Sequence, residues 1–171
     1  MAVVNLKSQV VTDLDATPVV KTSPHEIGGV VREAVGTIAV TDDDATSTFR
    51  LVRVPSRARI TDVFLANDDL DGATPALAVD VGLYLSEGGA VVDVDFFASA
   101  ITQLQAAAGY TDVTYESAVV DLPNRGKRLW EQLALTVDPE VEYDVALTVT
   151  TAAGTFQAGD ILMKVRYVLP E

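Results

Sequence analysis

The sequence holds few residues of the types that catalysis requires. His25 is the one histidine, cysteine is absent, and no Gly-x-Ser-x-Gly run occurs. A general base needs a shaped pocket around it, whereas His25 lies in a stretch rich in proline and glycine, where a surface histidine is expected. Without a thiol or a nucleophile elbow, covalent catalysis has little support. The residue types therefore predict that the chain is not an enzyme.

Phosphate and metal sites also lack their full patterns. The glycine pairs at 28–29 and 88–89 have neither the further glycines nor the lysine of a phosphate loop, so they predict turns. Residues 67–72 (NDDLDG) begin like a calcium loop, but its twelfth position, which needs a bidentate glutamate, is Ala78. Residues 42–44 are three aspartates without ligand spacing. Solvated acidic turns are the favoured interpretation of both segments, weak cation binding stays open, and no metal or cofactor is predicted.

Two basic clusters stand out in an acidic chain of net charge −13. This segregation predicts a surface with two kinds of charge, and two interpretations are equally supported: docking onto an acidic patch of a protein or of a neighbouring copy, or ordinary pairing with the many carboxylates. Nucleic acid and anionic membrane are not expected partners, because the net charge repels them and no aromatic residues are interleaved to stack on bases. The clusters are Arg50, Arg53, Arg57 and Arg59, and then Arg125, Lys127 and Arg128.

The elements that must carry these residues are mainly strands. Apolar residues alternate with polar or small ones in residues 76–85 (ALAVDVGLYL), 141–150 (VEYDVALTVT) and 160–168 (DILMKVRYV). This period predicts antiparallel strands with one buried and one wet face. Further strands are expected at 47–54 and 57–66, with turn residues between them. The spacing is typical of an antiparallel β-sandwich or jelly roll, an all-β fold.

The middle of the chain is less regular. Residues 95–105 (DFFASAITQLQ) have apolar residues near helical spacing and predict a short helix, and residues 111–117 predict a strand. Residues 126–135 (GKRLWEQLAL) predict the one clear helix, with Asn124 as its N-cap. Such a helix plugs one end of a sandwich, so we expect Trp130 in the core.

Residues 1–34 differ from the rest, and we expect the sandwich domain to span 35–171. The segment holds prolines, adjacent glycines and eight valines in its first thirty-one residues, without a helical or strand period. A mobile terminus is one interpretation. The valines favour the other, an extended N-terminal arm that becomes ordered on a neighbour.

Composition and length bound the class of protein. At 171 residues and 49% hydrophobic, the chain is expected to fold around a sizeable core. The start of the sequence has no basic stretch followed by an apolar signal segment, and no run approaches the ~20 apolar residues of a membrane helix. These features predict a soluble protein made in the cytoplasm, and the absence of cysteine makes it indifferent to redox conditions.

Several segments resemble a group of tailed-bacteriophage virion structural proteins, and the resemblance covers most of the chain. Members with an assigned place resemble capsid decoration (cement) proteins. The resemblance implies a jelly-roll subunit on the capsid surface of the virion, a trimer whose arm reaches adjacent subunits, with the major capsid protein as partner. It implies no catalytic residue. It is carried by residues 1–20, 28–30, 35–37, 53–60 (RVPSRARI), 81–84 (VGLY), 88–93 (GGAVVD), 95–98 (DFFA) and 127–133 (KRLWEQL).

Three functions follow as hypotheses. The first is a decoration protein that binds the major capsid protein and neighbouring copies, and the second is a head–tail or tail-associated component of the virion. The third, a carbohydrate-binding sandwich, is weakest because sugar platforms need exposed aromatic residues and only 6% of the chain is aromatic. The residues expected to bind a partner are Val3, Val4, Leu6, Val10, Val11, Val19, Val20, Arg53, Arg57 and Arg59.

Overall fold

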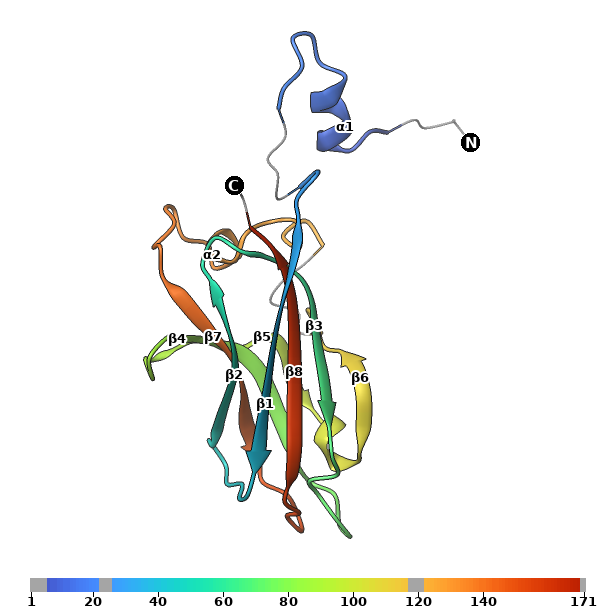
Figure 1. Ribbon diagram of the computed structural model, residues 1–171, viewed down its shortest axis with the longest axis vertical. Coiled ribbons are helices and arrows are strands. Elements are labelled where there is room, and N and C mark those ends of the chain that lie inside the picture. The colour runs from blue at the N-terminus through green and yellow to red at the C-terminus, as the bar shows by residue number, and fades with distance from the viewer. Residues whose placement is uncertain (1–5, 22–25, 117–121, 170–171) are drawn as a thin grey trace.

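The computed structural model describes residues 6–21, 26–116 and 122–169, so His25, Val3 and Val4 lie outside the described residues. Two antiparallel sheets of four strands each face one another (Figure 1). One sheet has the order β1-β8-β3-β6 and the other β2-β7-β4-β5. The strands are β1 (Val31–Val40), β2 (Thr48–Pro55), β3 (Arg59–Asn67), β4 (Ala78–Leu85), β5 (Val91–Ile101), β6 (Ala108–Asp112), β7 (Glu142–Thr151) and β8 (Gly159–Val168).

The strand order is that of a jelly roll. Successive strands cross between the sheets, except that β4 and β5 are neighbours in one sheet. Eight strands wound in this way form two Greek keys around a single core. The predicted all-β sandwich or jelly roll is therefore confirmed.

The core lies between the sheets and is formed by the inward residues of the alternating segments. Each of these side chains is at most 3% exposed, so the predicted period-two pattern is confirmed for the three segments that showed it most clearly. They are Val79, Val81 and Leu83 on β4, Tyr143, Val145, Leu147 and Val149 on β7, and Ile161, Met163 and Val165 on β8.

The predicted wet face is wrong for β4 and β7. Asp80, Tyr84 and Asp144 on the outer side of these strands are also buried. Gly82 shows one reason, because a β-carbon there would overlap the backbone of residues 93–94, so β5 lies across this part of β4. The two strands are central in their sheet, and neighbouring side chains cover their outer faces.

The helix predicted at 95–105 is wrong, since these residues belong to β5 and the short 3-10 helix η1 (Gln103–Gln105). Leu83 pairs with Asp93 while Val81 pairs with Ala98, so β5 bulges strongly against β4. The bulge allows the adjacent Phe96 and Phe97 to be buried together, with their rings edge-to-face at 4.9 Å. This irregular strand spaces its apolar residues as a helix would. β6 also lies earlier than the strand expected at 111–117.

The predicted helix near residue 130 is present but short. α2 (Leu129–Gln132) begins after Arg128, not after Asn124, and the backbone N–H of Arg128 donates to Glu131 Oε2 at 2.8 Å. Leu129 is fully buried, whereas Trp130, expected in the core, is half-buried beneath the Arg128 guanidinium, 4.8 Å from the ring centroid. α2 covers one end of the sandwich, as expected (Figure 1).

The N-terminal segment contains a helix that the sequence did not predict. α1 (Gln9–Leu14) starts at Ser8, whose hydroxyl accepts from the backbone N–H of Val11 at 3.3 Å. The prediction of an N-terminal arm that is extended throughout is therefore wrong for residues 9–14. β1 begins at Val31, so residues 31–34 form part of a strand. Figure 1 shows α1 beyond the end of the sandwich that carries α2.

Candidate interaction surfaces

The N-terminal segment exposes most of its apolar side chains. Leu6 is 88% exposed, Val19 60% and Val20 50%, and α1 has no buried residue. Val11 is also exposed, and Val10 is half-buried. Exposed apolar side chains gathered in one segment are typical of a surface that another molecule covers. The geometry therefore suits the predicted binding role, which stays a prediction.

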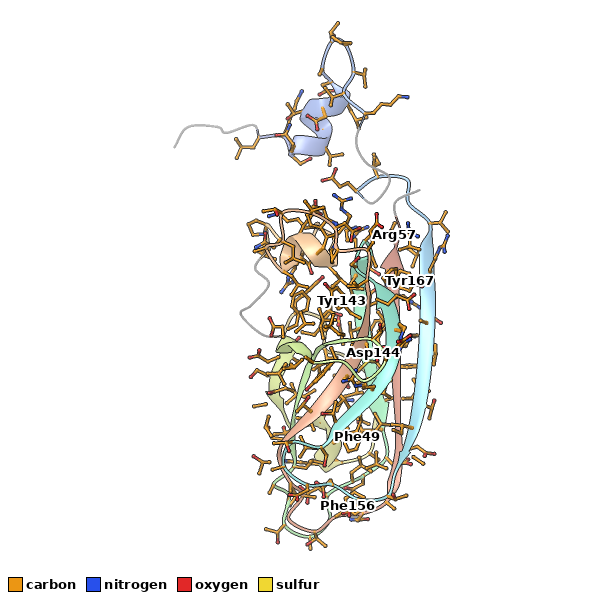
Figure 2. All side chains as sticks on the ribbon, turned by 90° about the vertical axis from the view of Figure 1, so that its left-hand side faces the viewer. Phe49, Arg57, Tyr143, Asp144, Phe156 and Tyr167 are labelled. Carbon is orange, nitrogen blue, oxygen red and sulfur yellow. The ribbon has the colours of Figure 1, made fainter. Side chains whose placement is uncertain are left out.

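Arg57 is placed by a tight turn between β2 and β3. The N–H of Ala58 donates to the carbonyl oxygen of Pro55 at 2.9 Å, and Ser56 and Ala58 are buried while Arg57 points outward. Hydrogen bonds from the backbone of Leu129 and Trp130 tie this turn to α2. Figure 2 shows Arg57 at the end of the sandwich next to the arm.

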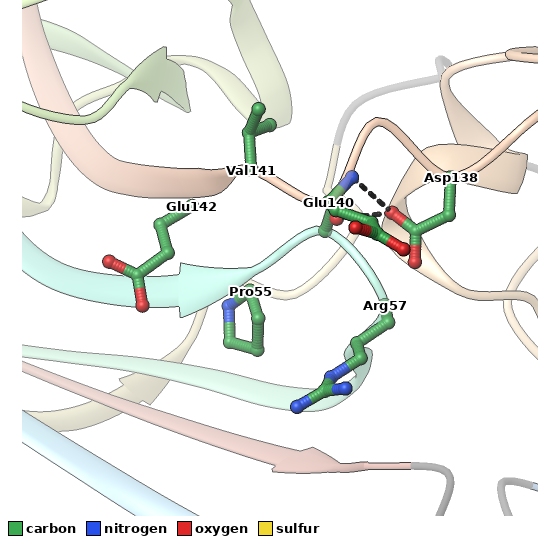
Figure 3. A pocket seen from close by; sticks show the side chains of 7 residues that line it. Pro55, Arg57, Asp138, Glu140, Val141 and Glu142 are labelled. Carbon is green, nitrogen blue, oxygen red and sulfur yellow. Dashed lines mark hydrogen bonds between the residues drawn. The ribbon is translucent and has the colours of Figure 1, made fainter.

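A hollow of about 370 Å³ lies beside this turn. The carboxylate of Asp138 accepts hydrogen bonds there from the Ser56 hydroxyl and from the backbone N–H of Glu140 (Figure 3). Glu140 and Glu142 add carboxylates, so the lining carries three acidic residues and the single cation Arg57. Within the described parts of the chain, Arg57 forms no ion pair. Its guanidinium is available to a partner.

Arg50 and Arg53 lie on the outer face of the second sheet and bind Asp144. Arg53 Nε donates to Asp144 Oδ1 at 2.7 Å, and Arg50 Nη1 donates to Asp144 Oδ2 at 3.3 Å. Burial raises the pKa of Asp144, but hydrogen bonds from Arg53 and Arg50 outweigh it and hold that pKa below its ordinary value. Ordinary pairing with a carboxylate therefore describes these two arginines.

Arg59 lies in another hollow, of about 280 Å³, together with Arg125. Arg59 belongs to the first basic cluster of the sequence and Arg125 to the second, so the fold brings the two clusters together here. Asp112 and Tyr115 also line this hollow. The predicted arginines Arg53, Arg57 and Arg59 thus line three different hollows and form no single site. Arg125 was not among the expected binding residues, because only the tertiary structure places it beside Arg59.

The acidic turns use their carboxylates on the backbone of their own chain. Asp71 is 1% exposed and accepts from the N–H groups of Ala76, Leu77 and Thr155. Burial raises the pKa of Asp71, and these backbone donors together lower it below the ordinary value. Asp43 likewise accepts from a backbone N–H, that of Ala153, at 2.7 Å. Among the described residues no group of three or more candidate ligands could hold a metal ion.

At the end of the sandwich opposite α2, two of the four loops are rich in aspartate and none carries a basic residue. This end is formed by the β1–β2, β3–β4, β5–β6 and β7–β8 loops, which contain no lysine or arginine. The α2 end, in contrast, carries both acidic and basic side chains. Its basic residues include Arg57, Arg59 and Arg125. Charge is therefore divided along the long axis of the molecule. The acidic residues of the far loops are Asp42, Asp43, Asp44, Asp68, Asp69 and Asp71.

The outer face of the first sheet exposes aromatic residues, but they do not form a flat platform. The rings of Phe64 and Tyr110 meet at 70°, with their centroids 6.2 Å apart. Lys164 Nζ lies 3.9 Å from the Tyr110 centroid and 5.0 Å from that of Phe64. A cation thus occupies the ring faces on which a sugar would stack. No helix in the described part of the chain is long and apolar enough to cross a membrane.

Two solved structures to which the chain is similar are phage capsid structures. The chain is 25% identical to a chain of the cyanophage Pam1 capsid asymmetric unit, over 84% of this chain and 88% of that one, with a TM-score of 0.58. A chain of the capsid of Ralstonia phage GP4 is 22% identical over 84% and 86%, with a TM-score of 0.60. Both neighbours are parts of phage capsids.

These neighbours support a phage virion structural protein, as the resemblance in the sequence implied. They also support a place in the virion and a capsid-related structural role. No protein-family model and no curated protein sequence matches the chain.

Proposed function

We propose that the chain is a capsid decoration (cement) protein that binds the major capsid protein and neighbouring copies, and so stabilises the phage head. It works by adhesion and without catalysis. The observation that carries the proposal is the N-terminal segment, residues 6–30, whose apolar side chains are exposed at the end of a capsid-type jelly roll. A shell of neighbouring subunits would cover them.

Burial of these side chains provides the binding free energy. Covering a valine or leucine fully is worth about 1.5–3 kcal/mol, and Leu6, Val11, Leu14, Val19 and Val20 are all exposed in the free chain. Ordering the segment on binding carries an entropic cost that opposes this gain. α1 lowers that cost, because its residues are already helical.

The two ends of the sandwich have different roles in this proposal. The α2 end faces the shell, since the arm leaves there and its mixed charges can pair with a partner. The far end, which has aspartates and no basic residue in its loops, faces solvent, where net negative charge keeps particles apart. A trimer around a local three-fold axis would place three arms on the shell at once, and such multivalency raises affinity without new kinds of contact.

Binding to heads stripped of this protein tests the proposal. The double variants Val11→Ser/Leu14→Ser and Val19→Ser/Val20→Ser should each weaken binding at least tenfold. Because these side chains are exposed in the free chain, the melting temperature should not change. The matched control is Val91→Ser/Val92→Ser, which alters exposed valines of the sandwich. Equal weakening by the control, or no weakening by the arm variants, would contradict the role of the arm.

Copy number separates this function from a head–tail or tail-associated role. A decoration protein follows the symmetry of the shell and should be present in hundreds of copies per particle. A tail-associated component should be present in about a dozen or fewer. Quantitative gel analysis of purified virions decides between them.

A further inference from the structure

β1 is an edge strand of the first sheet, and its pairing is long and regular. It pairs with β8 over all ten of its residues without a shift of register. In an antiparallel pair, alternate residues direct both backbone groups away from the neighbouring strand. Among the described residues, no backbone hydrogen bond joins β1 to any strand other than β8. One side of β1 therefore presents a row of N–H and C=O groups that a further strand could pair.

The other three edge strands carry features that usually prevent pairing with another chain. β2 shifts its register at Leu51 and ends at Pro55. β5 shifts its register against β4 three times, and Ala100 in this strand has a φ of 51°. β6 has only five residues and a shift of register against β3. β1 has no proline, no lysine and no such shift, so it is the edge that stays open to another strand.

The side chains in the first half of β1 leave this edge accessible. Val31 is 56% exposed and Val35 is 54% exposed. Both lie on the outer face of the sheet, since side chains alternate along a strand and Ala34 packs against the core from the other face. Glu33 lies between the two valines, and its carboxylate accepts from Arg166 Nε on β8 at 2.9 Å. This charge is therefore held over β8 and away from the open edge.

We propose that β1 receives an extended segment of the shell protein, which adds to the first sheet as a further strand. Main-chain hydrogen bonds supply the affinity, and apolar side chains of the incoming strand pack on Val31 and Val35. The proposal rests on the proposed function for the identity of this partner. β1 follows the N-terminal segment in the chain, and Figure 1 shows its start at the end of the sandwich nearest α1. One partner can therefore cover both surfaces.

A second copy of the chain is a less suitable occupant of this edge. Two β1 strands that pair around a two-fold axis set one residue opposite its own equivalent, and the contact closes as a dimer. Registers centred on Arg32 or Glu33 would set like charges directly opposite one another, which is destabilising. A strand of another protein meets neither restriction.

The first test is hydrogen–deuterium exchange of the full-length chain, both free and bound to heads stripped of this protein. Backbone amides of residues 31–36 should exchange at least tenfold more slowly in the bound chain, because the incoming strand accepts hydrogen bonds from them. β6 is the matched control, since it is the opposite edge of the same sheet and should exchange equally in both states. Unchanged exchange at residues 31–36 in a chain that binds heads would overturn the strand addition and leave the proposed function standing.

Two double variants separate main-chain pairing from a simple apolar contact. Val31→Lys/Val35→Lys gives the edge the side chain that most often blocks pairing, and should weaken binding to stripped heads at least tenfold. Val31→Thr/Val35→Thr keeps β-branched side chains beside an open edge, and should bind within about threefold of wild type. Thr111→Lys, at an exposed position of β6, is the control and should bind like wild type. Equal losses in the lysine and threonine variants would show a side-chain contact and overturn the proposal.

A synthetic peptide with the sequence of β8 tests the edge without the phage head. β8 is the strand that β1 already pairs with, so the peptide should bind the free chain saturably and slow exchange at residues 31–36. Val31→Lys/Val35→Lys should not bind it. If wild type fails to bind heads but binds the peptide in this way, the proposed function is refuted and the open edge stands. If neither heads nor peptide slows exchange there, or if a higher chain concentration alone does so through a dimer, the proposal is overturned.

Discussion

Arg53 on β2 and Asp144 on β7 are 91 residues apart in the sequence and directly opposite one another in the sheet, with Arg53 Nε 2.7 Å from Asp144 Oδ1. The same Asp144 side chain accepts from Arg50, which also donates to the carbonyl oxygens of Leu85 and Gly89. One buried carboxylate thus joins β2, β7 and the β4–β5 turn. This cluster stabilises the outer face of the sheet.

Asp144→Asn should lower the free energy of unfolding by about 2 kcal/mol. The neutral amide accepts weaker hydrogen bonds than the carboxylate, and its NH2 group, which is a donor, faces the guanidinium groups of Arg50 and Arg53. Urea denaturation at neutral pH measures the loss. The folded-state pKa of Asp144 is lowered, so its contribution is complete above the pKa of the unfolded carboxyl, about 4, and is lost as the pH falls through the lowered value. The difference between wild type and variant should therefore shrink below about pH 4. A difference that is constant across this range would contradict the assignment.

Asp71→Ala should destabilise the chain by about 3 kcal/mol or more. The variant removes the acceptor of the buried Leu77 backbone N–H, and also the acceptor of the Ala76 and Thr155 N–H groups. Thermal unfolding measures the effect, with Asp42→Asn as the control in another acidic loop at the same end. Asp42 is exposed and, within the part of the chain that the structure describes, accepts only from the neighbouring backbone N–H, so the control should behave like wild type. Similar losses in both variants would argue against the role of Asp71.

Gly36→Ala should be strongly destabilising, because a β-carbon on β1 would overlap the carbonyl oxygen of Leu51 on β2. The two edge strands meet at this point and close the sandwich. The backbone must move to admit the methyl group, at an expected cost of about 1–3 kcal/mol. Gly109→Ala on β6 is the matched control, since nothing lies within 4 Å of its added carbon. Chemical denaturation of the pair should separate them clearly, and equal stability would show that the sheets are not in contact there.

Asp93→Asn should raise the stability at neutral pH by about 0.5 kcal/mol. Burial and a hydrogen bond with Asp95 raise the pKa of Asp93, so ionising it in the folded state is unfavourable. This cost is absent below the unfolded pKa, about 4, and appears as the pH rises through the raised folded value. The gain in melting temperature should therefore vanish in acid. A gain that is larger at low pH would contradict the sign of the shift.

The sequence predicted the regular part of the fold because β4, β7 and β8 keep one residue of every two in the core. β5 does not follow that rule, since its bulge buries the adjacent Phe96 and Phe97 and so imitates helical spacing. α1 has no apolar face packed on the body, and hence no period by which it could be recognised. Local patterns reveal an element only when its side chains alternate between core and solvent.

The binding surfaces were less predictable for a related reason. The basic residues were visible as clusters in the sequence. Asp144, the carboxylate that pairs with Arg53, lies 91 residues away along the chain, so the pairing could not be predicted. Arg57 has no ion-pair partner among the described residues, because a tight turn directs it outward between the buried Ser56 and Ala58. The placement of Arg59 and Arg125 beside the same hollow depends on tertiary structure alone.

The central claim is that residues 6–30 bind neighbouring subunits of a phage head. A cryo-electron microscopy map of the intact particle, at a resolution that allows this segment to be traced, tests it most directly. We predict that Leu6, Val11, Leu14, Val19 and Val20 lie against other protein chains, with the α2 end toward the shell. A segment packed on its own sandwich and touching no other chain would contradict the claim.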